Sequence, residues 1–295
     1  MTTVGVVGTG EMGSAVGAAY RAGGARVVAS VAGRSPRSWR LAESAGLELL
    51  ESLDEVVVAA DVVVSVVPPA EARAVMEDVG RAAARTGARP LAADLNAVSP
   101  ATVRAVADRV REAGLELVDG SISGPPPRPD GSTTLYLAGP RAPELAGLPS
   151  PGLRPRLVGV DVGLASAVKM CTASVYKGHV ALFVHALLVA RANGVLPHVL
   201  EDLGDSYPDL VERANVVVAR GAAKSGRYVG EMREIEETQA AAGLTPALFA
   251  AMAEVYADLA AMTDGRPPEE VDSLAPLDAV LDRLARQAES ESSRD

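Results

Sequence analysis

The chain has 295 residues, enough for one large domain or two ordinary ones, and 48% hydrophobic residues can form a sizeable core. A net charge of −10 and an aromatic content of 3% argue against a nucleic-acid partner, which needs a basic surface or base-stacking side chains. The single cysteine, Cys171, excludes an internal disulfide or a multi-cysteine metal site, and its apolar neighbours predict a buried thiol. We expect no bound metal.

Two further exclusions concern location. No long apolar run is free of charged residues, so we expect no membrane span. The chain enters a Val-rich segment almost at once, at Val4, which leaves no room for a signal peptide. We therefore expect a cytoplasmic protein.

The first part of the chain alternates short Val-rich runs with Ala-rich helical stretches. The runs cover residues 4–7, 25–31, 61–67, 90–95 and 115–119. They are continuously apolar rather than alternating, which is typical of parallel strands covered on both faces. The pattern predicts an α/β Rossmann domain with a doubly wound, mainly parallel sheet over residues 1–161.

Strand signals fade beyond about residue 160, and the rest of the chain has helical periodicity. Helices are expected over residues 163–193, 209–220, 229–242 and 246–262. The change marks a domain boundary and predicts an all-α domain over residues 162–286. The polar tail, residues 287–295, is expected to be disordered.

A glycine-rich loop follows the first predicted strand and opens a predicted helix. Its residues are Gly8, Thr9, Gly10, Glu11, Met12 and Gly13. The first glycine permits a tight turn, the second lets the backbone approach a pyrophosphate, and the third allows close packing of helix on strand. The helix N-terminus presents free N–H groups and a positive dipole to the phosphates. The loop predicts a dinucleotide site.

The end of the second predicted strand indicates which dinucleotide binds. A site for NAD would place an acidic residue there to hold the ribose hydroxyls, but this chain has two arginines and two serines instead. Guanidinium groups match the geometry of a 2′-phosphate, so the sequence favours NADP(H). The candidate residues are Gly33, Arg34, Ser35, Arg37 and Ser38.

Three segments together resemble the β-hydroxyacid dehydrogenase family, which includes 3-hydroxyisobutyrate and 6-phosphogluconate dehydrogenases. The first is the glycine loop. The second, Asp119 to Gly124, is similar to the family's substrate-holding Asp-x-Pro-Val-Ser-Gly-Gly motif, although Pro125 replaces its last glycine. The third, Gly163 to Lys169, looks like the family's catalytic-lysine helix. The second half of the chain is most similar to a branch with a phosphogluconate-dehydrogenase-like C-terminal domain.

This resemblance implies roles for particular residues. Lys169 matches the family's general acid/base, which exchanges a proton with the substrate oxygen while the cofactor exchanges a hydride. Ser123 and Gly124 match substrate-holding positions. Four further residues, at two predicted strand ends, fall near the family's cofactor: Val67, Pro68, Pro69 and Asn96. The helical domain is expected to bind substrate and to form a homodimer.

The chain departs from the family one turn after the lysine, where Ala173 replaces an asparagine that binds substrate. Helical spacing puts Thr172, Tyr176 and Lys177 on the same side as Lys169. We therefore expect one of these three residues to contact the substrate instead.

Two other functions remain open at this point. Imine reductases are relatives of the family, and they generally lack the lysine, so Lys169 disfavours imine reduction without excluding it. A non-catalytic NADP-binding sensor or scaffold is the other alternative, because a fold alone does not define a function. The favoured interpretation is an NADP(H)-dependent oxidoreductase that acts on a β-hydroxy acid or a related carbonyl compound.

Overall fold

A computed structural model describes residues 1–263 and 275–292, with side chains described up to residue 285. The chain divides into two compact units, Met1–Cys171 and Thr172–Asp295. This division lies inside a long helix, ten residues after the boundary expected from the sequence, because the first turns of that helix bond to the sheet. Each unit is described separately below.

The first unit is built on one eight-stranded sheet with the order β3-β2-β1-β4-β5-β6-β7-β8. All pairs are parallel except β6 with β7. The strand order reverses between β1 and β4, where doubly wound sheets bind ligands. The strands are β1 Thr3–Val7, β2 Arg26–Ser30, β3 Glu48–Leu50, β4 Val62–Ser65, β5 Leu91–Asp94, β6 Leu117–Ser123, β7 Thr133–Ala138 and β8 Leu153–Gly159. The fold class expected from the sequence is confirmed.

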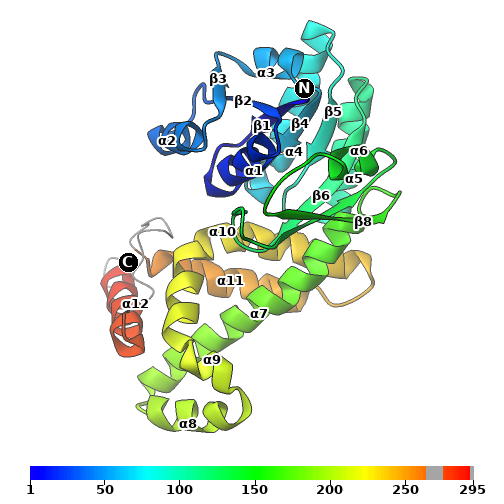
Figure 1. The fold of residues 1–295 in the computed structure, drawn as a ribbon. Coiled ribbons are helices and arrows are strands. Elements are labelled where there is room, and N and C mark those ends of the chain that lie inside the picture. The colour runs from blue at the N-terminus through cyan, green and yellow to red at the C-terminus, as the bar shows by residue number, and fades with distance from the viewer. Residues whose placement is uncertain (264–274, 293–295) are drawn as a thin grey trace. The chain divides into compact units, whose positions relative to one another are not determined.

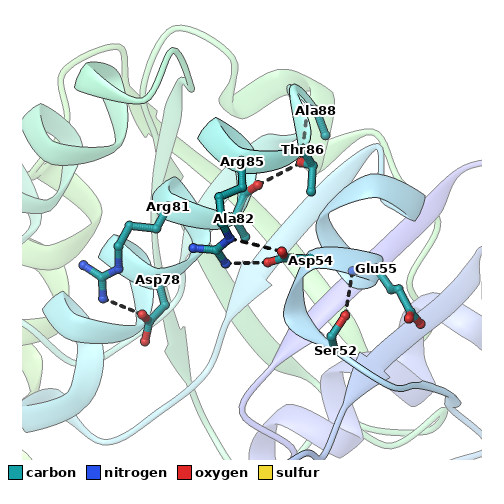
Figure 2. A network of polar contacts seen from close by, with 9 residues as sticks. All are labelled: Ser52, Asp54, Glu55, Asp78, Arg81, Ala82, Arg85, Thr86 and Ala88. Carbon is teal, nitrogen blue, oxygen red and sulfur yellow. Dashed lines mark hydrogen bonds and ion pairs between the residues drawn. The ribbon is translucent and has the colours of Figure 1, made fainter.

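Helices cover both faces of this sheet, as its continuously apolar strands require. One apolar core joins the sheet to α1, α2 and α6, and a second joins the other face to α3, α4 and α5. Figure 2 shows a surface link on the second face, where the guanidinium of Arg85 pairs with both carboxylate oxygens of Asp54. The bounds are α1 Glu11–Ala22, α2 Pro36–Ser44, α3 Leu53–Ala59, α4 Pro69–Thr86, α5 Pro100–Glu112 and α6 Ala142–Ala146.

The second unit is helical in all its described residues, as expected from the sequence. The expected helix over residues 163–193 is α7, which joins the two units. The remaining elements are α8 Leu196–Ser206, α9 Pro208–Glu212, α10 Ala214–Ala241, α11 Ala247–Ala261 and α12 Leu277–Ser292, and α7 itself spans Leu164–Ala192.

Three details of these helices differ from the sequence-based expectation. The helices expected over residues 209–220 and 229–242 are largely one helix, α10, because Gly221 lies against Val180 of α7 instead of ending a helix. Pro197 lies in the first turn of α8, a helix that was not expected, where proline is well tolerated. Residues 287–292 of the tail continue α12, while residues 293–295 lie outside the described residues.

One helix among the described residues, α7, is long and apolar enough by length and composition to cross a membrane, and 39% of its apolar window is buried. The charged side chains of Lys169, Lys177 and Arg191 lie within it. Val184 and Leu187 are buried, and Cys171 is exposed, contrary to the buried thiol expected from its neighbours. The helix therefore has one buried apolar side and one exposed apolar side.

Candidate active site

The glycine loop joins β1 to α1 with the geometry that the sequence predicts. Gly8 has φ +98°, and a Cβ there would lie 2.3 Å from the Val66 carbonyl oxygen. A Cβ on Gly13 would lie 1.9 Å from the carbonyl oxygen of Gly8. Both positions therefore need glycine so that the loop can fold.

Gly10 is different, because a Cβ built on it meets no protein atom within 4 Å. Gly10 is also the N-cap of α1, and no side chain bonds to the free N–H groups of the first turn. Beside it, Thr9 is 2% exposed and its hydroxyl has no hydrogen-bond partner among the described residues. A pyrophosphate fits this arrangement, since it would accept from the helix N-terminus and from a hydroxyl that the protein leaves unsatisfied.

The loop after β2 leads directly into the N-terminus of α2. Ser35 caps α2, accepting a hydrogen bond from the Ser38 N–H at 3.2 Å, and the two hydroxyls lie 3.2 Å apart. Arg34 is exposed and lies 3.5 Å from the carboxylate of Glu71 in α4. Arg37 follows in the first turn of α2. The predicted residues therefore lie on one loop and the first turn of α2, where the two serine hydroxyls are in contact.

Asn96 and Val67 come together at the ends of β4 and β5. The Asn96 amide oxygen accepts a bond from the Val67 N–H at 2.6 Å, and its NH2 group donates to Ser65 and to Asp94, both at 3.0 Å. Asn96 is only 3% exposed. Its side chain therefore fixes the turn into Pro68 and Pro69, which begin α4 beside the glycine loop.

Strand β6 anchors the start of α7 through a buried carboxylate. One Asp119 oxygen accepts from the N–H groups of Gly163, Ala165 and Ser166, at 2.8, 2.9 and 3.2 Å, and the other accepts the Ser166 hydroxyl at 2.7 Å. Burial raises the pKa of Asp119 above its ordinary value, although these hydrogen bonds act in the opposite direction. Ser121 adds a bond to the Ala165 carbonyl at 2.9 Å.

This anchor sets the position of Lys169, about one turn further along α7. The Lys169 ammonium donates to the carbonyl oxygen of Ile122 at 2.6 Å, and its side chain is partly buried. Ile122 directly precedes Ser123 and Gly124, so the expected proton donor lies next to the expected substrate-holding residues. Gly124 has φ +128°, a conformation that glycine adopts readily.

The other expected substrate residues belong to the second unit. Thr172 is half-buried, Tyr176 is 68% exposed and Ala173 is buried. The Lys177 ammonium contacts the buried carboxylate of Glu231, so its charge is already balanced inside this unit.

The pair of Lys177 and Glu231 has aromatic neighbours. The Lys177 ammonium lies 4.7 Å from the centre of the Tyr228 ring, and the Lys177 carbonyl accepts the Tyr256 hydroxyl at 2.7 Å. Burial raises the pKa of Tyr228. A substrate anion would have to compete with Glu231 for this lysine.

The roles of two acidic side chains, those of Asp119 and Glu231, were not predicted from the sequence. Asp119 was part of a recognised motif, but its role as the cap of α7 depends on residues 44 to 47 positions away. Glu231 lies in a helix with three other glutamates, Glu234, Glu236 and Glu237, and no sequence signal distinguishes it from them. The position of Asp119 at a strand end was the only available sign.

Comparison with known proteins agrees with this geometry. Residues 3–143 match the model of the NAD-binding domain of 6-phosphogluconate dehydrogenase, and residues 190–259 match a domain of unknown function. A conserved hypothetical protein from Sinorhizobium meliloti is 28% identical, with 97% of each chain covered and a TM-score of 0.66.

Two further structures are similar. A conserved protein of unknown function, described as structurally similar to 3-hydroxyacid dehydrogenases, is 29% identical, with 87% of this chain and 96% of that one covered and a TM-score of 0.65. A 3-hydroxyisobutyrate dehydrogenase of Mycobacterium tuberculosis, solved with L-serine, has the same fold at 20% identity, with 96% and 99% covered and a TM-score of 0.70.

The sheet order, the glycine loop and the NAD-binding match define a nicotinamide-dependent oxidoreductase with a Rossmann domain. Within that class, the helical second half and the structural relatives narrow the assignment. The two matched domains and the relative described as similar to 3-hydroxyacid dehydrogenases support the β-hydroxyacid dehydrogenase family.

Proposed function

We propose that this protein is an NADP(H)-dependent oxidoreductase that interconverts a β-hydroxy acid and the corresponding carbonyl compound. The observation that carries the proposal is the Lys169 ammonium, held 2.6 Å from the Ile122 carbonyl beside Ser123 and Gly124. Its place near the start of α7, bonded to β6 and in the same unit as the glycine loop, supports a role in chemistry rather than in nucleotide sensing.

Lys169 would supply the proton of the reaction. When bound, the nicotinamide supplies or accepts the hydride. In the reducing direction the ammonium donates a proton to the oxygen of the former carbonyl group and stabilises the charge that develops there; in the oxidising direction the amine accepts the hydroxyl proton. The Ile122 carbonyl orients the ammonium, and Asp119 holds the helix that carries it.

The preference for NADP(H) is supported by the residues on the loop after β2 and in the first turn of α2. Arg34 and Arg37 would pair with the 2′-phosphate, while Ser35, Ser38 and the free N–H groups at the start of α2 would donate hydrogen bonds. Gly33 has φ +70°, a conformation that glycine adopts readily, and a Cβ there would meet nothing within 4 Å. Glu71 lies beside Arg34 and would exchange its ion pair for the phosphate.

We propose candidate substrate residues in each of the two units. Ser123 and Gly124 follow the carbonyl that the ammonium binds. Thr172 and Tyr176 lie one and two turns further along α7, and Lys177 is a third candidate only if it exchanges Glu231 for a substrate anion. We also propose a cytoplasmic location, because the exposed thiol of Cys171 suits a reducing compartment.

Lys169→Met, which keeps the bulk of the side chain and removes the ammonium, tests the catalytic assignment. With β-hydroxy acids, keto acids and cyclic imines as candidate substrates, we expect kcat to fall by about 10² to 10⁴, a typical contribution of general acid/base catalysis. NADPH binding, followed by the fluorescence of the cofactor, should be unchanged. Unaltered turnover would overturn the role of Lys169, and turnover of imines alone would identify an imine reductase.

Arg34→Ala tests the cofactor assignment separately. We expect NADPH to bind more weakly while NADH affinity stays the same, because only NADPH carries the 2′-phosphate. Equal losses for both cofactors would contradict the preference for NADP(H). Arg40→Ala, which removes a neighbouring exposed arginine near the end of α2's second turn, is the matched control.

A further inference from the structure

A pocket of about 520 Å³ lies at the amino edge of the sheet in the first unit. Its wall includes Thr2, Asp61 and Pro90, which directly precede β1, β4 and β5. The glycine loop and Asn96 follow the opposite ends of β1 and β5, so the length of the strands separates this pocket from the candidate active site. Its volume lies within the range of about 300 to 1,000 Å³ that is usual for small-molecule sites.

Much of the pocket wall is apolar. Val57, Val62 and Leu91 lie in it, and each is at most 7% exposed. Val58 and the half-buried Leu148 also line the pocket, and because Val58 is 61% exposed, the pocket is open to solvent. A ligand that places an apolar group against these side chains gains free energy from the apolar surface that it removes from water.

Four charged side chains line the same pocket: Asp61, Arg89, Arg141 and Glu144. Two of them neutralise each other, because the Arg141 guanidinium donates to both carboxylate oxygens of Glu144, at 2.6 and 2.7 Å. This bond lowers the pKa of Glu144 below its ordinary value. Within the described part of the chain, Asp61 and Arg89 form no ion pair, either with each other or with another residue. One negative and one positive charge are therefore available to a ligand.

The backbone holds the guanidinium of Arg89 in place. One of its terminal nitrogens donates to the carbonyl oxygens of Ala83 and Ala88, at 3.3 and 2.8 Å. Arg85 and Arg81, four and eight positions earlier, are instead paired with acidic side chains (Figure 2). The remaining N–H groups of Arg89 bond to none of the described residues, and a guanidinium fixed in this way suits a carboxylate.

Asp61 enters the pocket from the neighbouring strand. Its Oδ2 atom accepts the Thr3 N–H at 2.8 Å, and its other oxygen accepts no hydrogen bond from the described residues. Val62 and Leu91 are paired across β4 and β5, so Asp61 and Arg89 precede adjacent strand starts. An acid and a guanidinium that share a pocket without pairing are complementary to a molecule that carries both an ammonium and a carboxylate.

We propose that this pocket binds a free amino acid with an apolar side chain. The carboxylate of the ligand accepts from Arg89, its ammonium donates to the free oxygen of Asp61, and its side chain lies against Val58 and Leu148. A dianion such as phosphate fits less well, because Asp61 and Glu144 are acidic and Arg89 is the one unpaired cation among the lining residues that the structure describes. The proposal does not depend on the reaction at Lys169.

Calorimetric titration of the full chain with L-leucine tests the class of ligand. Two analogues each remove one charge: 4-methylpentanoate lacks the ammonium, and 3-methylbutylamine lacks the carboxylate. We expect saturable binding of leucine, and binding of each analogue that is about tenfold weaker or more, the usual effect of losing a hydrogen bond between charged groups. Absence of saturable leucine binding, equal affinity for either analogue, or tighter binding of inorganic phosphate would each overturn the proposal.

Substitutions then locate the bound leucine. Arg89→Gln removes the cation, and Asp61→Asn removes the negative charge while keeping an oxygen for the Thr3 N–H. Each should weaken leucine binding about tenfold or more. Arg81→Gln, at a paired arginine of α4 outside the pocket, and Lys169→Met, at the candidate active site, should leave it unchanged. Full affinity in Arg89→Gln, or a loss in Lys169→Met, would place the leucine elsewhere and contradict the assignment.

Discussion

Gly10 and Gly13 differ in what an added methyl group would meet. A substitution at Gly10 should therefore affect cofactor binding, and one at Gly13 should affect stability. Gly10→Ala adds a Cβ where no protein atom lies within 4 Å, so the fold should be unaffected while the pyrophosphate loses its close approach. We expect weaker NADPH binding and an unchanged midpoint of urea unfolding. Gly13→Ala forces a Cβ against the Gly8 carbonyl and should lower that midpoint. A destabilised Gly10→Ala variant would contradict the proposed role of this glycine.

Asp119 is the residue whose removal should most disturb the start of α7. Asp119→Ala leaves three N–H groups and one hydroxyl without their acceptor in a buried place, which should cost about 3 kcal/mol of unfolding free energy. Asp119→Asn keeps one carbonyl oxygen for the N–H groups and should cost about 1 kcal/mol. Equal losses in the two variants, measured by urea unfolding, would show that the carboxylate oxygens do not act as the cap.

The proton affinity of Asp119 gives this comparison a pH dependence. Burial raises its folded pKa above the unfolded value, so between the two values the unfolded chain binds fewer protons. The native sequence should therefore lose stability relative to Asp119→Asn as pH rises from about 4, where an unfolded aspartate titrates. Unfolding free energies of both proteins between acidic and neutral pH measure this difference. A difference that grows in favour of the native sequence with rising pH would contradict the raised pKa.

At the scale of elements, α10 stays continuous through Gly221 and Gly226, which lie in the gap between the two helices expected from the sequence. Gly221 is buried against α7, and a Cβ there would lie 2.7 Å from a methyl group of Val180, a stiff β-branched side chain. Gly221→Ala should therefore destabilise the protein by about 1 kcal/mol or more, despite the better helix propensity of alanine. Gly230→Ala, in the same helix with nothing within 4 Å, should stabilise by roughly 0.5 to 1 kcal/mol. Thermal unfolding of both variants tests the contact, and the same sign for both would argue against it.

Elements with a strong local signal were predictable from the sequence. The five Val-rich runs became β1, β2, β4, β5 and β6 because each is buried on both faces and needs no long-range information to be recognised. The strands β3, β7 and β8 were missed. Strand β3 is short, β7 has no continuous Val-rich run, and β8 is largely exposed, with an alternating charged pattern. The continuity of α10 could not be predicted from the local sequence, because Gly221 packs against Val180, a residue of another helix.

The candidate site likewise contains features that the sequence predicted and others that it could not predict. The glycine loop carries its own backbone requirements, so its position and role followed from the sequence. Asn96 was expected near the cofactor. Its side chain forms hydrogen bonds with Val67, Ser65 and Asp94, and these bonds stabilise the turn after β4. The engagement of Lys177 with Glu231 joins two helices, and helical spacing along α7 could not reveal it.

At the scale of the whole molecule, the net charge determines how the expected homodimer should respond to salt. Two copies with a net charge of −10 each repel one another, and added salt screens that repulsion once the Debye length falls below about 10 Å. The exposed apolar side of α7, with Val175, Leu182 and Val189, offers such a dimer contacts that salt does not weaken, and residues 178 to 190 of that helix include no Asp, Glu, Lys or Arg to form ion pairs, which salt would weaken. We therefore expect the dimer dissociation constant to fall between low and high sodium chloride concentrations. Sedimentation at a series of salt concentrations measures this, and a dimer that loosens with salt would point to an interface built on ion pairs elsewhere on the chain.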